Sequence, residues 1–222
     1  GTRVEGVEKR EDGVSVASRD AAGVPQTLCA EKLLVAVGRK PNTDDIGLEN
    51  TAIRTDRGFI PVDGWMATAE PGVYAVGDIV AASPQLAHVA SMQGLVAVGR
   101  IAGKPVRPLN YRRIPSCTYC EPQIGSVGLT EAEARAQGHA IKVGKFGFGA
   151  NAKASILGAH RGFVKVVAEE TVGEILGVHV IGPSATELIA EAVAAMEAEA
   201  TVETMMYTIH AHPTLAEAMQ EA

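Results

Sequence analysis

The sequence predicts two architectures within one chain of 222 residues, an α/β part followed by an α+β part. In the first hundred residues, short apolar runs end at glycine and precede a long helical pattern, which is typical of an α/β fold. In the second half, strand-like segments follow one another and only a few helices interrupt them, which favours an α+β fold. Residues 104–108 have the character of a connection, so we place a domain boundary near residue 107.

Composition argues against several classes of function. The net charge is −6 and there is no cluster of Lys or Arg, which argues against a general nucleic-acid binder. The hydrophobic fraction is 46% and the charged fraction 21%, as in ordinary globular proteins. No stretch approaches the roughly 18 apolar residues that span a bilayer. Three cysteines make no disulfide framework, so we expect a cytoplasmic protein without a membrane segment.

Turn signals divide the first part of the chain into strands. Polar and apolar residues alternate around turns at residues 11–13 and 20–23, which predicts three hairpin-linked strands. The apolar run at 33–37 ends at Gly38 and predicts a buried strand followed by a loop. Residues 73–76 lie between two turn signals and predict a second buried strand.

Helical patterns and further strands fill the rest of the chain. A helix is predicted from about residue 84 to 102, where Gly103 ends it. Capping boxes at 130–133 and 184–187 predict the starts of two more helices. Strands are predicted at residues 116–119, 124–129, 140–146, 163–168 and 175–181.

Four stretches carry residues suited to chemistry. They read V-A-V-G-R-K-P-N-T at 35–43, T-A-E-P-G-V-Y-A-V-G-D at 68–78, P-Q-L-A-H at 84–88 and H-A-H-P-T-L-A-E at 210–217. Asp78 follows a predicted buried strand, where open α/β sheets bind ligands and a carboxylate can accept bonds from sugar-like hydroxyls. A simple strand-ending turn is the alternative interpretation, because Asp is a common turn residue. The unpaired N–H groups at a helix start near residue 85 suit an electron-rich partner.

His212 and Glu217 are the sharpest candidate pair. An imidazole can take and return a proton near neutral pH, and a carboxylate bonded to one ring nitrogen fixes the tautomer. Glu217 also completes a capping box that begins at Thr214, so a plain helix start is the alternative. His210 would face the opposite way in an extended segment, so we expect the two histidines not to share a role.

The four stretches, with N-A-K-A-S at 151–155 and L-G-V-H-V-I-G-P at 176–183, resemble the C-terminal half of the flavin-dependent disulfide reductases. Within that family they resemble the dihydrolipoamide dehydrogenases, and the resemblance covers essentially the whole chain. It implies the end of a nicotinamide-nucleotide domain at 1–45 and a central segment contacting FAD at 46–107. An interface domain that forms a homodimer would follow at 108–222.

The resemblance also implies a reaction and its residues. Dihydrolipoamide would be oxidised to lipoamide and NAD reduced, through FAD and a redox disulfide. The enzyme would serve a 2-oxo-acid dehydrogenase complex whose lipoyl domains are partners. His212 would be the acid/base and Glu217 its partner, after a cis His212–Pro213 bond, and the ring would reach into the other subunit's active site. No metal is implied. The residues implied to contact the cofactors are Gly38 for the nicotinamide nucleotide, and Gly77, Asp78, Gln85, Leu86, Ala87 and His88 for FAD.

Several features that the family needs are missing from this sequence. The sequence has no G-x-G-x-x-G motif, of which the family needs one for FAD and one for the nicotinamide nucleotide. It also has no C-x-x-x-x-C pair of redox cysteines. We therefore expect a fragment that holds no FAD and has no reductase activity by itself. The alternatives are a glutathione- or mercuric-reductase-like enzyme and a non-catalytic dimerisation module.

The segment Cys117-Thr-Tyr-Cys120 has the CxxC spacing of a dithiol redox pair or of half a zinc site. A zinc site needs a second ligand pair, and none follows at a suitable spacing. A reactive pair usually sits at a helix N-terminus, whereas this segment is predicted to be a strand with its two thiols on opposite faces. We interpret the segment as structural.

Overall fold

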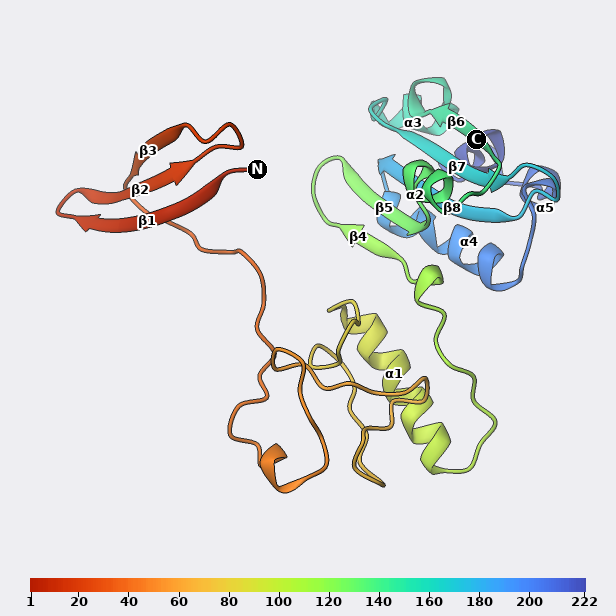
Figure 1. The fold of residues 1–222 in the computed structure, drawn as a ribbon. Helices are drawn as coiled ribbons and strands as arrows, with labels where there is room; N and C mark the ends of the chain where they lie inside the picture. The colour runs from red at the N-terminus through yellow and green to blue at the C-terminus, as the bar shows by residue number, and fades with distance from the viewer.

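The computed structural model describes all 222 residues, which form three units joined by extended segments (Figure 1). A small three-stranded sheet comes first. A middle region with one long helix follows, and a larger unit of five strands and several helices ends the chain. The mixed α/β and α+β class predicted from the sequence is confirmed.

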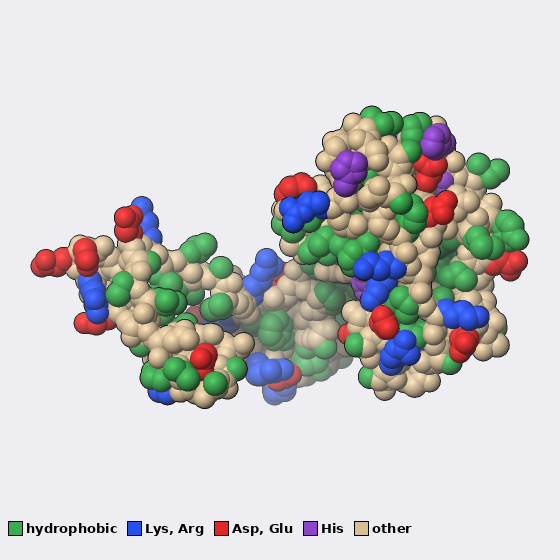
Figure 2. Space-filling view, turned by 90° about the horizontal axis from the view of Figure 1, so that it is seen from above, with side chains coloured by type: hydrophobic (Ala, Val, Ile, Leu, Met, Phe, Trp, Pro, Cys, Tyr) green, Lys and Arg blue, Asp and Glu red, His purple; other side chains and the backbone are tan.

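The N-terminal sheet consists of three antiparallel strands in the order β1-β2-β3, with bounds β1 (Arg3–Arg10), β2 (Gly13–Arg19) and β3 (Pro25–Ala30). This confirms the predicted hairpins. Much of the sheet's apolar surface faces solvent: the exposed fractions of Val4 and Leu28 are 59% and 61%. Figure 2 shows such hydrophobic side chains on the surface at its left. The sheet therefore has little core of its own.

Both buried strands predicted in the first half are wrong. Residues 33–37 form no strand, and the exposed fractions of Leu34 and Val37 are 87% and 88%. Residues 73–76 make only a single antiparallel bridge, from Tyr74 to Ala67, and only Ala75 is buried. The physical reason is that a buried strand needs neighbouring strands for its N–H and C=O groups. No segment of this chain pairs with residues 33–37, and residues 73–76 have only the one bridge.

The middle region packs around a small apolar cluster of Ile53, Ile60, Ala75 and Val80. A short 3₁₀ turn, η1 (Leu48–Asn50), precedes the cluster. The helix α1 (Ala87–Ile101) begins three residues later than predicted, because Leu86 is still extended with a φ of −129°. Gly103 follows the helix with a positive φ of 64°, a conformation that glycine adopts without strain.

The C-terminal unit is built on one antiparallel sheet in the order β4-β5-β8-β7-β6. A 3₁₀ turn, η2 (Tyr111–Arg113), leads into it. The strands are β4 (Ser116–Thr118), β5 (Gln123–Gly128), β6 (Ile141–Gly147), β7 (Phe163–Glu169) and β8 (Ile175–Gly182). All five predicted strands are confirmed, with small shifts at their ends.

Helices cover this sheet and enclose a core of 15 buried residues, including Phe148, Val178, Ile189 and Met219. Helix α4 (Ala185–Glu197), the longest of this unit, packs against β5 and β8. It approaches closely because Gly125 has no side chain: a Cβ there would lie 2.5 Å from the carbonyl oxygen of Ala185. The helical elements are α2 (Glu131–Ala136), η3 (Phe148–Ala150), α3 (Ala152–Leu157), α4 (Ala185–Glu197), α5 (Val202–Tyr207) and α6 (Glu217–Glu221).

Of the capping boxes predicted at 130–133 and 184–187, the first is confirmed. Thr130 and Glu133 bond each other's backbone N–H groups at the start of α2. Ser184 makes no capping bond, because its backbone is left-handed with a φ of 55°. Gln123 of β5 replaces it, since its Oε1 accepts bonds from the N–H and the hydroxyl of Thr186 at 3.2 and 2.8 Å. None of the helices has the length and apolar character required to cross a membrane.

Candidate acid–base pair and cofactor-binding residues

His212 and Glu217 are in direct contact. The ring Nδ1 of His212 lies 2.8 Å from Oε1 of Glu217, and the other carboxylate oxygen accepts the backbone N–H of Thr214, also at 2.8 Å. Glu217 therefore does both things that its sequence pattern suggested: it holds the histidine ring and it satisfies a backbone donor next to α6. The His212–Pro213 peptide bond is cis, as the resemblance implied.

This contact assigns the two ring nitrogens of His212. The pKa of the Glu217 carboxyl is lowered, first by the Thr214 N–H and then by the bond from His212, so the carboxylate is ionised and accepts. Nδ1 must then carry the proton, which leaves Nε2 as the basic nitrogen. Nε2 bonds no residue of the chain, and the side chain is 70% exposed. The basic atom is therefore open to a substrate.

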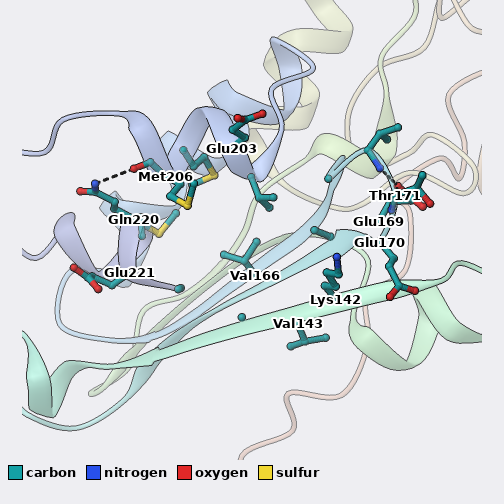
Figure 3. A pocket seen from close by; sticks show the side chains of 18 residues that line it. Lys142, Val143, Val166, Glu169, Glu170, Thr171, Glu203, Met206, Gln220 and Glu221 are labelled. Carbon is teal, nitrogen blue, oxygen red and sulfur yellow. Dashed lines mark hydrogen bonds between the residues drawn. The ribbon is translucent and has the colours of Figure 1, made fainter.

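Two further side chains hold the segment that carries this pair. Asn151 is almost completely buried: its amide donates to the carbonyl of Thr214 at 3.0 Å, and its oxygen caps α3 through Ala154 N–H at 2.9 Å. Gln220 of α6 donates to the carbonyl of Met206 at 2.9 Å, a bond drawn in Figure 3. These bonds fix the turn after His212 and the helix that carries Glu217. The sequence motif around Asn151 gave no indication of this role.

The groove shown in Figure 3 lies beside α6 but is a different place from the acid–base pair. Its lining comes from β6, β7, α5, α6 and the residues that follow β7. Met206, Gln220 and Glu221 contribute to it, whereas neither His212 nor Glu217 does. The candidate base is presented on the exposed surface of this chain and not inside a cavity.

His210 forms a second histidine–carboxylate pair that sequence analysis did not foresee. Its Nε2 lies 2.7 Å from Glu191 of α4, and its Nδ1 lies 3.0 Å from the carbonyl oxygen of Thr208. Burial alone would lower the pKa of His210, but the bond to Glu191 and its charge outweigh that and raise it. Both nitrogens face acceptors and the side chain is only 7% exposed, so this geometry favours the protonated ring and a structural role for His210. The two histidines have different partners, as expected.

Gly77 and Asp78 form an exposed turn in front of α1. Gly77 has a φ of 84°, which favours glycine, and its N–H is bonded to the side chain of Gln93. The Asp78 carboxylate is 48% exposed and lies 3.3 Å from Arg39, which comes from the first of the four stretches. Gln85 donates to the carbonyl of Asp78 at 3.3 Å. Three of the four stretches therefore meet at Asp78, although no strand precedes it.

The start of α1 and Gly38 offer backbone groups to a ligand. No side chain caps α1, so the N–H groups of its first turn have no partner in the chain. Leu86 is the N-cap, and Ala87 and His88 begin the helix. The ring of His88 is engaged elsewhere, with Nε2 2.9 Å from the carbonyl of Pro115. Gly38 has a φ of 74° and nothing within 4 Å of where a Cβ would lie.

The two groups of candidate residues are not in contact within one chain. No hydrogen bond or ion pair joins His212 or Glu217 to Asp78, Gly38 or the start of α1. Figure 1 places α1 in the middle region and the C-terminus in the other unit. A site that uses both groups of residues therefore cannot form from these two units as they are arranged within one chain.

Cys117 and Cys120 are both free thiols. Cys117 lies on β4, and burial raises the pKa of its thiol, as does the nearby charge of Glu187. That is the opposite of what a reactive cysteine needs. Cys120 lies beyond the end of β4, so our expectation that both residues share one strand is wrong. Its Sγ lies 3.1 Å from the carbonyl oxygen of Pro122.

Comparison with known proteins adds an independent line of evidence. Residues 1–94 match a family described as pyridine nucleotide-disulphide oxidoreductase, and residues 114–222 match the dimerisation domain of pyridine nucleotide-disulphide oxidoreductases. The dimerisation domain supports a homodimer.

Similar curated proteins carry one name. A protein of Rhizobium etli named dihydrolipoyl dehydrogenase is 45% identical over 99% of this chain and 46% of its own length. One of Thermus scotoductus with the same name is 48% identical over 100% of this chain and 48% of its own length. The chain thus spans about half the length of the curated relatives it matches.

Solved structures agree with the fold. LpdA from Mycobacterium tuberculosis superposes with a TM-score of 0.91 at 31% identity, over 100% of this chain and 47% of that one. The flavoprotein disulfide reductase RclA from Escherichia coli superposes with a TM-score of 0.87 at 25% identity, over 98% of this chain and 49% of that one. Two family matches, relatives over the full length of the chain and the shared fold together show that this chain belongs to the pyridine nucleotide-disulphide oxidoreductases and resembles their dihydrolipoyl dehydrogenases.

Proposed function

We propose that this chain is part of a dihydrolipoyl dehydrogenase, an NAD-dependent enzyme that oxidises dihydrolipoamide to lipoamide. The observation that carries the proposal is the His212 ring, whose Nδ1 is held by Glu217 while Nε2 is exposed and unpaired. A dithiol substrate must lose protons before it can act as a nucleophile, and a basic imidazole nitrogen is suited to remove them. The names of the similar proteins support the same reaction.

His212 would act at its Nε2. That atom takes a proton from a thiol of dihydrolipoamide, so the sulfur becomes a thiolate and the ring becomes an imidazolium. Glu217 stays ionised beside Nδ1 and stabilises the positive ring without moving a proton itself. The ring then releases its proton to solvent. The Thr214 N–H matters here because it keeps the carboxylate in place and charged.

The residues of the middle region fit FAD. An exposed carboxylate at Asp78, a glycine turn at Gly77 and an uncapped helix start suit a polyol chain beside an electron-rich ring. Asp78 and Gly77 would hold the ribityl chain, and Gln85, Leu86, Ala87 and His88 would face the flavin ring. Bound FAD supplies the passage of electrons between the dithiol and the nicotinamide nucleotide. Gly38, with open space around its Cα, would lie near NAD.

The assembly proposed is a homodimer in which His212 completes the active site of the other subunit. The lack of any bond between His212 and the cofactor-binding residues of its own chain supports this arrangement. Lipoyl domains of a 2-oxo-acid dehydrogenase complex are the proposed carriers of the substrate. We keep the division into 1–45, 46–107 and 108–222 as part of the proposal. The proposed compartment is a reducing cytoplasm, on the evidence of the three free cysteines.

The test is a substitution of the base in the holoenzyme that contains this chain. We expect His212→Gln to lower kcat/KM for dihydrolipoamide by roughly 10²–10⁴-fold, because a positioned base contributes about that much. FAD content should not change. The matched control is His160→Gln, since His160 is exposed and its ring bonds no residue of the chain. It should turn over like the wild type.

Two results would count against the proposal. Normal dihydrolipoamide turnover by the His212→Gln enzyme would remove His212 from the reaction. The proposed substrate would be wrong if the wild-type enzyme reduced glutathione disulfide or mercuric ion and did not oxidise dihydrolipoamide. We also propose that this chain by itself retains no FAD. A purified chain with a flavin absorption band would contradict that part.

A further inference from the structure

Gln93 is the one polar side chain of the middle region that solvent does not reach at all. It lies on α1, on the face that also buries Val89 and Val96, and its exposed fraction is 0%. Burying an amide without hydrogen-bond partners destabilises the folded state. A side chain in this position is therefore expected to make specific bonds, and it does.

The Gln93 amide bonds three separate segments. Its Oε1 accepts the backbone N–H of Gly77 at 2.7 Å. Its Nε2 donates to the hydroxyl of Ser83 at 2.8 Å and to the hydroxyl of Tyr111 at 3.0 Å. Both N–H groups of the amide are used, and the Gly77 donor decides which end is oxygen. One side chain thus ties the turn before Asp78, the loop before α1 and η2 to the middle of a helix.

The bond to Gly77 is the one that bears on Asp78. Asp78 is the next residue, so the direction of its carboxylate depends on how the Gly77 peptide is held. Within the turn, the Val80 N–H donates to the Gly77 carbonyl at 3.0 Å. The other side-chain hydrogen bond to this turn comes from Gln85, is longer at 3.3 Å and lies in solvent, where such bonds contribute little. The ion pair with Arg39 is exposed as well. Gln93 therefore makes the only hydrogen bond that a buried side chain contributes to the turn.

We propose that Gln93 is a positioning residue for the flavin cofactor, which holds the Gly77–Asp78 turn from beneath in the form that binds FAD. The inference rests on the proposed function, because it assumes that Asp78 contacts FAD. It goes beyond that function by naming a residue that never touches the cofactor. It also links the cofactor turn, through Tyr111, to the segment that leads into the dimerisation domain.

The first variant removes the bonds and keeps the volume. In the holoenzyme that contains this chain, Gln93→Met leaves the Gly77 N–H without its partner, and we expect the dissociation constant for FAD to rise roughly tenfold to a hundredfold. Gln93→Glu is the rescue variant. A carboxylate can accept from Gly77 and from both hydroxyls, whose protons can rotate, so the constant should stay within about threefold of wild type.

The matched control separates positioning from stability. Val96→Ala enlarges the same buried face of α1 without touching the Gly77 turn. We expect it to lower the unfolding temperature of the apoprotein at least as much as Gln93→Met does, yet to leave the FAD constant unchanged. Should Gln93→Met fail to fold, Tyr111→Phe removes one bond to the amide, and the FAD constant should rise by about two- to tenfold.

The results of these measurements test the positioning role of Gln93 separately from the proposed reaction. An unchanged FAD constant in Gln93→Met, or in Tyr111→Phe if that variant is needed, would overturn the inference. So would Val96→Ala weakening FAD as much as Gln93→Met, because the role would then be merely structural. A wild-type enzyme that binds FAD but ignores dihydrolipoamide would overturn the proposed reaction and leave this inference standing. A wild-type enzyme that binds no FAD would overturn both.

Discussion

Residues 114–222 and residues 1–113 differ in how far each completes its own contacts. The C-terminal unit has a five-stranded sheet and a core of 15 buried residues. Its His212–Glu217 pair has hydrogen-bond partners that come from the same unit. The first half has a core cluster of 4 residues, and the apolar run at 33–37 faces solvent. The run at 33–37 therefore has strand-forming side chains but no partner strand in this chain.

The same contrast applies to the two candidate sites. Glu217, Thr214 and Asn151 hold His212 in place by hydrogen bonds within the unit. Asp78 has exposed partners, and only its neighbour Gly77 has a buried one. The His212–Glu217 contact is therefore braced by several hydrogen bonds, whereas the Gly77–Asp78 turn has a hydrogen bond from only one buried side chain, that of Gln93.

The largest expected effect concerns the C-terminal core. Phe148 is fully buried in the core of 15 residues, so Phe148→Ala should cost about 3–5 kcal/mol of unfolding free energy in that unit. Trp65 is the only tryptophan and lies in the middle region, so its fluorescence reports the other half. We expect the substitution to shift the circular-dichroism transition and not the fluorescence transition. A joint shift of both would show that the two halves unfold as one.

A smaller effect is expected from the side chain that braces the acid–base pair. Asn151→Ala removes the cap of α3 and the bond to Thr214, and should cost about 1–2 kcal/mol in the C-terminal unit, measured by urea denaturation. The matched control is Asn110→Ala, which removes an exposed cap from η2. It should cost less, because solvent can replace that bond. Equal costs would contradict the prediction, because they would show that burial of the Asn151 bonds adds nothing to their contribution to stability.

Stability of the C-terminal unit should also depend on pH through His210. Its folded pKa is raised above the ordinary value of 6.5, because the bonds and charge of Glu191 outweigh burial. Folding therefore gains from this proton fully below pH 6.5, and the gain is lost as pH rises through the folded pKa. Above pH 6.5 the unfolding midpoint of the unit should fall with rising pH. The fall should be absent in His210→Gln and in Glu191→Gln, and an unchanged slope in both variants would refute the assignment.

The smallest effect is expected where the sequence looks most buried. Val35 is 73% exposed, so Val35→Ser should change the unfolding free energy of this chain by no more than about 0.5 kcal/mol. The same substitution in an intact enzyme, where a neighbouring strand would cover the run, should cost several times more. Comparing the two by chemical denaturation measures how much of the first half is completed by contacts from outside this chain. Equal, small costs would mean that no strand forms there.

What could be predicted from the sequence follows the same line. Strands of the C-terminal unit, the turns of the first sheet and the Thr130 cap are local patterns, and they formed as expected. The strand predicted at residues 33–37 is wrong because strand formation depends on a partner strand, and a local sequence pattern says nothing about that partner. The His212–Glu217 contact was foreseen from spacing and resemblance. The roles of Asn151, Glu191 and Gln93 were not, because each acts on a segment that lies far from it along the chain.

The two bonds of Glu217 make side-chain length itself a requirement at that position. One carboxylate oxygen is committed to the His212 ring and the other to the Thr214 backbone, at equal distances of 2.8 Å. A shorter acid, as in Glu217→Asp, keeps the charge but cannot span both contacts from the same backbone position. It would have to release either the ring or the amide. The length of the Glu217 side chain thus matters as much as its charge, because a carboxylate that reaches less far would leave the His212 ring misaligned.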